Sequence, residues 1–394
     1  MKILILSFSW LQTQPRVLRQ ISSLSANHDL TVAGYGLLSV SGVNVISLKG
    51  LASTTNPQLT RFPASLRIFR AALAFLGSFR LLYWVFHPAV KHAKKLLLRQ
   101  DFDLIIANEL ETVPLAMKVA QGAPVIADLH EYTPGHLQPG SLAYVAYQRY
   151  RLWLTRNYLT KPSALLTVGT GISKLYEDNW GVPPLHLVRN APRYEELAPS
   201  DVHPDKIEVV YHGLGGPGRG LEAILKALEG LPTEFEAHFY IAGGGDEELR
   251  ARATEFGIEH RVMIHPPVKT VDIAKTINKH DVAVVFHEPH TENFRDSLPN
   301  KFFESIQARL AIVVSPSPEM ASIVESYKIG LVAKDHSPEA LAEALLSLDP
   351  QSILRFKRQS NRAAIDYCWE NEEKAFMDAL LSIRPKEYRN FEPQ

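Results

Sequence analysis

The sequence has little of the features that mark disulfide-rich, secreted or membrane-spanning proteins. Of its 394 residues only one is cysteine, Cys368, so no disulfide can form within the chain, and a reducing cytoplasmic compartment is expected. Its first residues, MKILILSFSWL, contain one lysine and a short apolar run. A secretory signal peptide has a longer basic region, a longer apolar core and a cleavage site, so we expect a first buried strand here instead.

Carboxylates are missing from one long stretch, because no Asp or Glu lies between Asp29 and Asp101. Residues 61–100, within this gap, hold eight lysines and arginines among many aromatic and aliphatic side chains, and arginines interrupt the apolar runs. These runs are therefore too short for a membrane-spanning helix. Cationic side chains on apolar helices suit the surface of an anionic bilayer, at about 1 kcal/mol per basic residue. We expect this segment to contact the inner face of the cytoplasmic membrane; a basic helical hairpin packed in the core is the alternative.

The net charge of zero conceals an asymmetry between the two halves of the chain. Residues 1–195 contain 20 Lys and Arg against 10 Asp and Glu, and the remaining residues contain 22 against 32. A basic first half and an acidic second half indicate different partners for the two halves. Nucleic acid is not expected as a partner, because no recognisable nucleic-acid-binding motif is present.

Both halves repeat one pattern, a short apolar strand followed by an amphipathic helix. Strands are expected at residues 2–8, 29–36, 44–48, 103–108, 124–130 and 164–169, and then at 206–213, 236–244, 261–267, 282–288, 311–315 and 329–334. Continuous apolar strands that alternate with helices predict parallel sheets covered on both faces. We therefore predict an α/β chain of two doubly wound domains, with a ligand site in the cleft between them. The expected parts are residues 1–192, 193–375 and a C-terminal tail or helix at 376–394 that returns to the first domain, with a linker at 190–206.

A glycine-rich turn follows the first strand of the second half. Gly213, Gly215 and Gly218 match the spacing G-x-G-x-x-G between a strand and a helix, where backbone N–H groups can approach a phosphate. A dinucleotide site would also need an acidic residue at the end of the next strand, and that strand ends in glycines. Arg219, at the start of the following helix, favours a doubly charged diphosphate. A glycine-rich turn without a ligand is the alternative.

A second candidate site is the helix that starts in RDSLPNKFFESI, residues 295–306. Pro299 suits a helix start, and Asn300 and Lys301 would line its positive end. Lys301 opposes the helix dipole, which favours a bound anion at this position. Glu304 lies one turn further along, away from the face of Phe303 and Ile306, and a carboxylate there could accept hydrogen bonds from a diol. An ordinary solvated glutamate is the alternative.

Five segments, which follow one another along the chain at the expected separations, give the chain a resemblance to a known family. They are YHG…RGLEAIL at 211–225, the stretch 239–268, SLPNKFFESIQARLAIVVS at 297–315, DLHEY at 128–132 and VRNAP at 188–192. Together they resemble the family 4 retaining glycosyltransferases of the GT-B fold, in which two Rossmann-like domains face each other across a cleft. The resemblance covers nearly the whole chain and is strongest in the second half.

The resemblance implies a role for individual residues of this sequence. Glu304 would hold the ribose of a nucleotide-diphosphate sugar, and Asp296, where the family usually has a glutamate, would face the sugar with Ser297 and Leu298. The diphosphate would be bound by the glycine turn and the helix start, through Gly213, Gly215, Arg219, Pro299, Asn300 and Lys301. Leu214 replaces a family arginine, and Lys301 is the expected substitute. The base would lie by residues 265–268 and contact Pro267 and Val268. His130, which is followed by Glu131, would lie near the sugar. The expected catalytic residues are His130, Asp296 and Glu304.

The implied reaction is sugar transfer with retention of configuration, without a metal or other cofactor, to a saccharide or lipid-linked acceptor in cell-surface polysaccharide synthesis. The sequence DFD at 101–103 reads as a turn rather than a metal site, and His287 and His290 lack a convincing third ligand. Two alternatives remain open. One is a sugar-nucleotide epimerase of similar architecture, and the other is a protein that binds nucleotide-sugars without turnover.

Overall fold

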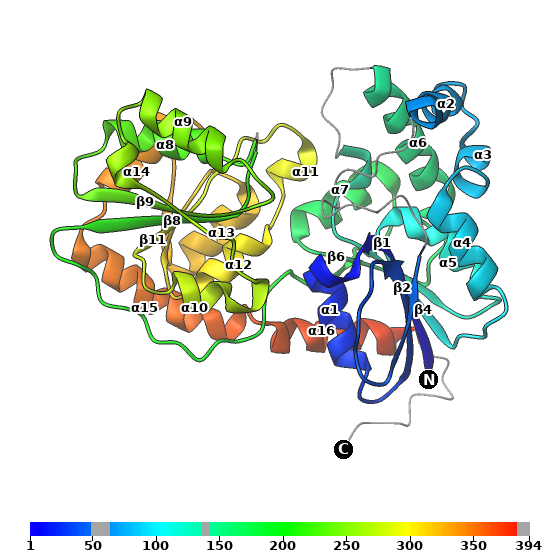
Figure 1. The fold of residues 1–394 in the computed structure, drawn as a ribbon. Helices are drawn as coiled ribbons and strands as arrows, with labels where there is room; N and C mark the ends of the chain where they lie inside the picture. Colours follow the sequence, from blue (N-terminus) through cyan, green and yellow to red (C-terminus); the bar gives the residue numbers. More distant parts are fainter. Residues whose placement is uncertain (49–63, 136–141, 217, 384–394) are drawn as a thin grey trace. The chain divides into compact units, whose positions relative to one another are not determined.

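The computed structural model describes residues 1–48, 64–135, 142–216 and 218–383 and divides into two compact units (Figure 1). Unit 1 comprises Met1–Val188 and Glu373–Gln394, of which residues 384–394 lie outside the described part. Unit 2 comprises Arg189–Glu372. The C-terminal helix α16 (Trp369–Ser382) starts in unit 2 and ends in unit 1, where Leu380 lines the same pocket as Met1 and Phe102.

Unit 1 is built on a parallel sheet of seven strands in the order β3-β2-β1-β4-β5-β6-β7. Six of them coincide with strands expected from the apolar runs, and the seventh, β7, is a two-residue strand that no periodic pattern could reveal. The strands are β1 (Lys2–Trp10), β2 (Asp29–Tyr35), β3 (Val43–Ser47), β4 (Leu104–Asn108), β5 (Val125–Leu129), β6 (Ala164–Thr167) and β7 (His186–Leu187).

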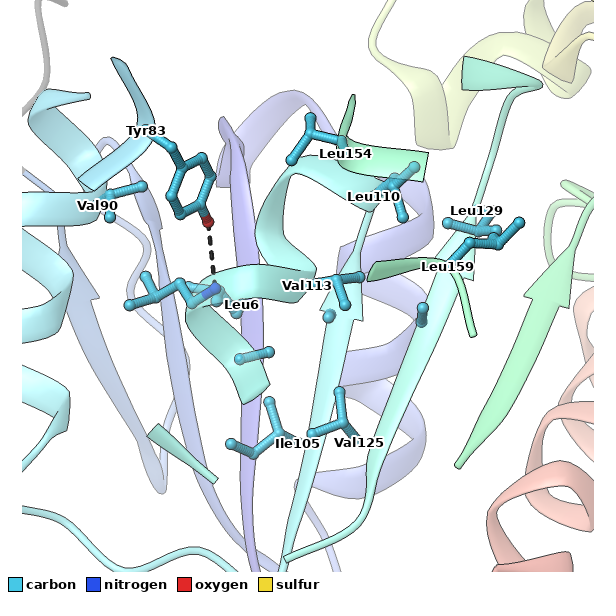
Figure 2. Packing of buried hydrophobic residues seen from close by; sticks show 14 of the residues in the cluster. Leu6, Tyr83, Val90, Ile105, Leu110, Val113, Val125, Leu129, Leu154 and Leu159 are labelled. Carbon is cyan, nitrogen blue, oxygen red and sulfur yellow. Dashed lines mark hydrogen bonds between the residues drawn. The ribbon is translucent and has the colours of Figure 1, made fainter. Parts of the chain in front are cut away.

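Helices cover this sheet, and on one face they enclose a large apolar core. The helices are α1 (Pro15–Leu24), α2 (Ala64–Phe75), α3 (Phe79–Trp84), α4 (Pro88–Leu97), α5 (Val113–Val119), α6 (Leu142–Tyr158) and α7 (Thr170–Trp180). Figure 2 shows side chains of this core, among them Leu6, Ile105 and Val125 of the sheet. The Tyr83 hydroxyl accepts a hydrogen bond from the Leu115 N–H at 3.2 Å, so a polar atom in the core is satisfied (Figure 2).

Unit 2 contains a six-stranded parallel sheet in the order β10-β9-β8-β11-β12-β13. Every strand overlaps a predicted run, and only β8 and β9 extend beyond theirs, by one residue each. The strands are β8 (Ile207–Leu214), β9 (Phe235–Ala242), β10 (Val262–His265), β11 (Val282–Val285), β12 (Ala311–Val314) and β13 (Gly330–Val332). In Figure 1, α8, α9 and α14 lie over one face of this sheet, and α10, α12 and α15 lie over the other. The helices are α8 (Leu221–Gly230), α9 (Asp246–Glu255), α10 (Ile273–Ile277), α11 (Glu292–Arg295), α12 (Asn300–Gln307), α13 (Pro318–Tyr327), α14 (Pro338–Leu346) and α15 (Pro350–Asp366).

The two sheets share one topology. In each, the chain first adds strands to one side of the first strand and then returns to its other side, so a switch point lies between β1 and β4 and between β8 and β11. Ligands of such sheets bind at the carboxyl ends of the strands beside the switch point. The prediction of two Rossmann-like parallel-sheet domains is therefore confirmed, and it directs attention to the two carboxyl edges.

The expected linker, residues 190–206, is fastened to unit 2 rather than free. The Glu195 N–H donates to Gln307 Oε1 at 3.0 Å, and its carbonyl accepts from the guanidinium of Arg309. Ser200 donates to the Asn278 carbonyl at 2.6 Å. The proline-rich composition therefore marks an extended segment whose polar groups are paired with unit 2.

Three short 3-10 turns in unit 1 are Leu11–Thr13, Leu110–Thr112 and Thr133–Gly135, and two in unit 2 are Glu259–Arg261 and Thr270–Asp272.

Among the described helices, none combines the length and the apolar character that crossing a membrane would require.

Candidate functional site

The glycine turn after β8 is shaped by close backbone packing. A Cβ on Gly215 would lie 2.1 Å from the Gly244 carbonyl oxygen, and one on Gly220 would lie 1.8 Å from that of Phe286. Gly220 also has a φ of +83°, which side chains other than glycine rarely adopt. These two glycines bring the turn against the loop after β9 and the end of β11, so the carboxyl edge at the switch point is compact. Gly213, with a φ of +131°, and Gly218 complete the turn.

Two cations act on this edge. The Lys301 ammonium lies over the Tyr211 ring, 4.3 Å from its centroid. Burial, followed by repulsion from Arg219, lowers the pKa of Lys301 to about 7, and Glu304 only partly opposes the shift. The low pKa shows that the negative charge around Lys301 is too small to stabilise its protonated form. The surroundings of Lys301 are therefore suited to an anion.

Helix α12 begins at Asn300, and Pro299 is its N-cap residue, with φ −72° and ψ 149°. Proline has no side-chain oxygen for capping, so the N–H groups of the first turn have no side-chain cap. The Asn300 Oδ1 is buried and has no hydrogen-bond partner within the described part of the chain. The helix ends at Gln307, and Leu310 is buried just beyond it.

Glu304 is buried, with 7% of its surface exposed, and its Oε2 lies 2.9 Å from His212 Nε2 near the end of β8. The solvated glutamate considered from the sequence is therefore wrong. The pairing joins α12 to the carboxyl end of the first strand of unit 2 and fixes the direction of the carboxylate. His212 was not predicted, although its place at the end of a strand before a glycine turn was a usable signal.

The residues expected at the sugar differ in what their side chains can do. Asp296 is 5% exposed, and its Oδ2 is 2.7 Å from the guanidinium of Arg295. Ser297 Oγ donates to the Phe294 carbonyl at 3.0 Å. Leu298 is 3% exposed and belongs to an apolar cluster with α12, so only its backbone is available for a ligand.

The residues expected at the base lie after β10. Pro267 is exposed, whereas Val268 is half-buried and packs on an apolar cluster with Val210 and Tyr240. The His265 ring stacks on Tyr240 with centroids 4.4 Å apart. The segment therefore presents backbone and proline at the surface and anchors itself by its other side chains.

His287 and His290 do not form a metal site with each other in the described structure. His287 Nε2 lies 3.0 Å from the Phe294 carbonyl and 3.4 Å from Ser297 Oγ. Burial lowers the pKa of His287 to about 4, with contributions from Lys301 and Arg219. The His290 ring instead lies 3.6 Å from where a Cβ on Gly218 would be. The two histidines help to hold the loop after β11.

The carboxyl edge of unit 1 contains a buried network around Asp128. Its carboxylate accepts hydrogen bonds from Arg16 Nε and Nη2 and from Gln20 Nε2, each at 2.6 Å. His130 lies just beyond β5, with Nδ1 3.0 Å from Glu109 Oε1 and Nε2 3.1 Å from Asn108 Oδ1.

Burial alone would lower the pKa of His130, but the carboxylates of Glu109 and Asp128 raise it to about 9. Likewise, burial would raise the pKa of Asp128, but Arg16 and His130 hold it well below its usual value. His130 is therefore a cation at neutral pH, and its charge is met by carboxylates within the unit.

Glu109 has a φ of +70°, in the region that favours glycine, although it is an ordinary residue. Such backbone strain is concentrated at functional sites, and here it places the Glu109 carboxylate against His130. Sequence reasoning missed Arg16, Gln20, Asn108 and Glu109. The position of Asn108 and Glu109 at the end of β4 was an available signal, whereas Arg16 and Gln20 lie within α1 and no such signal marked them. Asp103, in the DFD turn, accepts a hydrogen bond from the Lys2 N–H at 2.7 Å, at the opposite, amino end of the strands.

Comparison with known proteins places this geometry in a family context. A family model described as Glycosyl transferases group 1 matches residues 207–349, which lie in unit 2. A D-inositol 3-phosphate glycosyltransferase of Xylanimonas cellulosilytica is 26% identical over 168 residues, 41% of this chain and 38% of that one. The match thus spans about two fifths of the relative's length.

Solved structures share the whole fold. A sucrose-phosphate synthase from Thermosynechococcus elongatus superimposes with a TM-score of 0.72 at 13% identity, covering 97% of this chain and 99% of that chain. Alr3699/HepE from Anabaena, in complex with UDP-glucose, gives 0.71 at 15% identity, covering 97% of this chain and 100% of the other. The resemblance to group 1 glycosyltransferases is confirmed, by sequence in unit 2 and by the GT-B fold over both units.

Proposed function

We propose that this protein is a retaining, metal-independent glycosyltransferase of the hexosyl type that uses a nucleotide-diphosphate sugar. The observation that supports it most is the carboxyl edge of unit 2, where Arg219, Lys301 and the uncapped start of α12 surround the place of an anion next to a carboxylate held by His212. A family 4 assignment rests on the sequence resemblance.

In this proposal each group has one task in binding. Arg219, Lys301 and the α12 N–H groups bind the diphosphate and stabilise the charge it gains as the sugar leaves. Glu304 accepts hydrogen bonds from the ribose hydroxyls, and His212 keeps its carboxylate in place. Residues 265–268 lie along the base.

In the front-face route that we propose for retention, the acceptor hydroxyl attacks from the face that the diphosphate leaves. The acceptor proton then passes to the departing phosphate oxygen, and no protein nucleophile is needed. His130 is protonated at neutral pH, and both of its ring nitrogens have partners in unit 1, so it would have to exchange one of these partners to donate a hydrogen bond to the sugar. Asp296 would contact the sugar by its carboxylate and Leu298 by its backbone.

Uridine nucleotides are the first donors to test, since solved structures of HepE and TarM with the same fold hold UDP-glucose and UDP. Thermal stabilisation by UDP, GDP and their sugars, compared at equal concentration, should identify the base, because a ligand of the native state raises stability by mass action. Slow hydrolysis of the matching sugar nucleotide without acceptor is then expected. No stabilisation by any nucleotide would contradict the proposal.

A binding protein without turnover is the second candidate, since Asp296 is already paired with Arg295 and the exposed Leu214 replaces a phosphate cation. Stabilisation by a sugar nucleotide, with neither hydrolysis nor transfer to any acceptor offered, would favour this candidate.

We further propose that helices α2, α3, α4 and α6 of unit 1 rest on an anionic membrane surface, where a lipid-linked saccharide acceptor would lie. Eight of the fifteen large hydrophobic side chains that are exposed in the described part lie on or next to these helices: Phe69, Phe75, Leu76, Leu81, Val85, Leu96, Val145 and Tyr147. Exposed cations accompany them, namely Arg80, Lys91, Lys95, Arg99 and Arg149. Residues 61–63 of the basic segment lie outside the described residues.

A matched pair of substitutions tests the membrane surface. Leu76 is 74% exposed in unit 1 and Val271 is 72% exposed in unit 2. Sedimentation with anionic vesicles should weaken several-fold for Leu76→Glu and stay unchanged for Val271→Glu, with negligible binding to neutral vesicles. Equal, negligible binding of the wild type to both kinds of vesicle would refute this surface, and with it the location at the inner face of the cytoplasmic membrane.

A further inference from the structure

A second cluster of titratable side chains lies in unit 2, towards the start of its strands. Glu208 is the second residue of β8, His238 lies on β9, and His280 comes just before β11. One potential ligand atom from each of these residues lies within 4.8 Å of the other two. The proposed donor site does not use any of the three.

The distances between the potential ligand atoms of the cluster are close to those between the ligands of one metal ion. Glu208 Oε2 is 2.7 Å from His280 Nδ1, and Glu208 Oε1 is 3.8 Å from His238 Nε2. Ligands of a tetrahedral zinc ion are about 3.3 Å apart when each lies about 2.0 Å from the metal. Small side-chain rotations would therefore bring the three ligands to the required spacing.

His238 provides an independent observation. It is 8% exposed, and its Nε2, which faces Glu208, has no hydrogen-bond partner among the described residues. A buried imidazole nitrogen without a partner is costly unless a ligand fills the place.

The outer ring nitrogens of both histidines are held in the way that metal ligands usually are. His238 Nδ1 lies 3.0 Å from His265 Nε2, and His280 Nε2 lies 3.1 Å from the Tyr240 hydroxyl. If Nε2 of His238 and Nδ1 of His280 face a metal, each opposite nitrogen carries a proton that it can donate to these partners.

We propose that Glu208, His238 and His280 bind a divalent transition metal, with Zn²⁺ the ion that best suits two imidazoles and a carboxylate. In neutral His280 the metal takes the place of the proton on Nδ1 and that proton moves to Nε2, so the carboxylate and both imidazoles bind the metal without net release of a proton. The fourth position would be left to water, because Glu208 is partly open to solvent. The ion would tie together β8, β9 and the start of β11, and none of its three ligands takes part in the proposed transfer reaction.

The charges around the cluster are compatible with a dication. Lys206 Nζ lies 3.1 Å from Glu208 Oε1 but also contacts Glu236, so two carboxylates share one ammonium. Behind His280, Lys357 lies 3.7 Å from Asp281, which offsets its charge.

Metal content and affinity test the site directly. Protein freed of metal with a chelator should bind one equivalent of Zn²⁺, measured by competition with a chromophoric chelator, and its melting temperature should rise. Co²⁺ in its place should give visible absorption bands of tetrahedral type. Glu208→Gln and His238→Gln should each weaken Zn²⁺ binding more than about 100-fold, and Tyr240→Phe, an outer partner, about 10-fold.

Controls separate this site from other histidines. His260→Gln, at an exposed residue, and His290→Gln, at the loop after β11, should bind Zn²⁺ as the wild type does. Glu208 is partly exposed, so Glu208→Gln provides a test even if His238→Gln fails to fold. Less than one equivalent in the wild type, or equal affinity in Glu208→Gln and the wild type, would overturn the proposal. UDP binding serves as a separate readout, so a failed metal site would leave the proposed function untouched.

Discussion

The two units have the same strand order, yet their carboxyl edges are filled in opposite ways. In unit 1 the charged groups Arg16, Asp128, His130 and Glu109 neutralise one another through hydrogen bonds. In unit 2 Arg219 and Lys301 repel each other, and Glu304 offsets them only in part. A shared topology thus places both sites but does not determine their chemistry. The carboxyl edge of unit 1 holds a completed network, whereas Arg219 and Lys301 at the carboxyl edge of unit 2 are not fully balanced by Glu304, so this edge suits an anionic ligand.

The largest effect is expected for a substitution that removes Asp128 from the hydrogen-bonded network of unit 1. Asp128→Ala leaves Arg16 buried without its carboxylate, which should lower the free energy of unfolding by about 3–5 kcal/mol. Four of the five tryptophans lie in unit 1, so fluorescence during urea unfolding reports on this unit. Asp178→Ala, at an exposed residue, should change the free energy by less than about 0.5 kcal/mol. Equal effects of the two substitutions would show that the network is dispensable.

The next largest effect is expected for the loss of the Glu304 carboxylate at the candidate site of unit 2. Glu304→Gln keeps an acceptor for His212 but loses the charge, so we expect UDP affinity to fall about 100-fold, or about 2.7 kcal/mol, by calorimetry. Glu325→Gln, at an exposed glutamate of α13, is the control and should bind as the wild type does. Unchanged affinity in Glu304→Gln would disprove the ribose assignment.

The units should also respond to pH with opposite signs. His130 has a folded pKa of about 9 against about 6.5 unfolded, so its stabilisation is present below pH 6.5 and is lost as the pH rises through 9. Lys301 has a folded pKa of about 7 against about 10.5 unfolded, so the cost of its charge is relieved between pH 7 and 10.5.

Between pH 7 and 9, unit 1 should therefore lose stability and unit 2 should gain it, each on the order of 1–3 kcal/mol. Hydrogen exchange measured by mass spectrometry resolves the two units. His130→Gln and Lys301→Met should each remove the trend of its own unit. A trend of the same sign in both units would contradict the pKa directions.

The sequence predicted the fold of this protein more completely than it predicted the candidate site. All twelve predicted strands are present because buried parallel strands are continuous apolar runs, which a sequence displays directly. Groups that act through a partner distant in sequence, such as His212 on Glu304 or Glu109 on His130, were missed. Their roles depend on register and on one strained backbone angle, and neither is encoded in a local pattern. For the same reason the burial of Glu304 was not foreseen, because its helix packs towards a histidine of another strand.

A smaller effect sharpens the assignment of Lys301. An anion beside it would raise its pKa, so UDP binding above pH 7 should take up a proton, and affinity should fall by up to about tenfold per pH unit between pH 7 and 9. Calorimetry in buffers of different ionisation enthalpy measures the proton uptake. Lys301→Met should bind more weakly and without this pH dependence. Arg219→Met should keep the dependence but shift it to higher pH, because Arg219 contributes to the low pKa.

The smallest effect concerns Asp296, one of the two residues, with Leu214, at which the sequence departs from the family that it resembles. Its carboxylate is held by Arg295, whose side chain is half exposed, so Asp296→Asn loses an ion pair worth about 0–1 kcal/mol. UDP carries no sugar, and its affinity should therefore change less than about threefold. The sugar nucleotide should lose more than UDP does, because only that ligand reaches the carboxylate. Arg295→Gln, which leaves Asp296 charged, should weaken neither ligand, and equal losses for both ligands in Asp296→Asn would assign the residue to the loop rather than to the sugar.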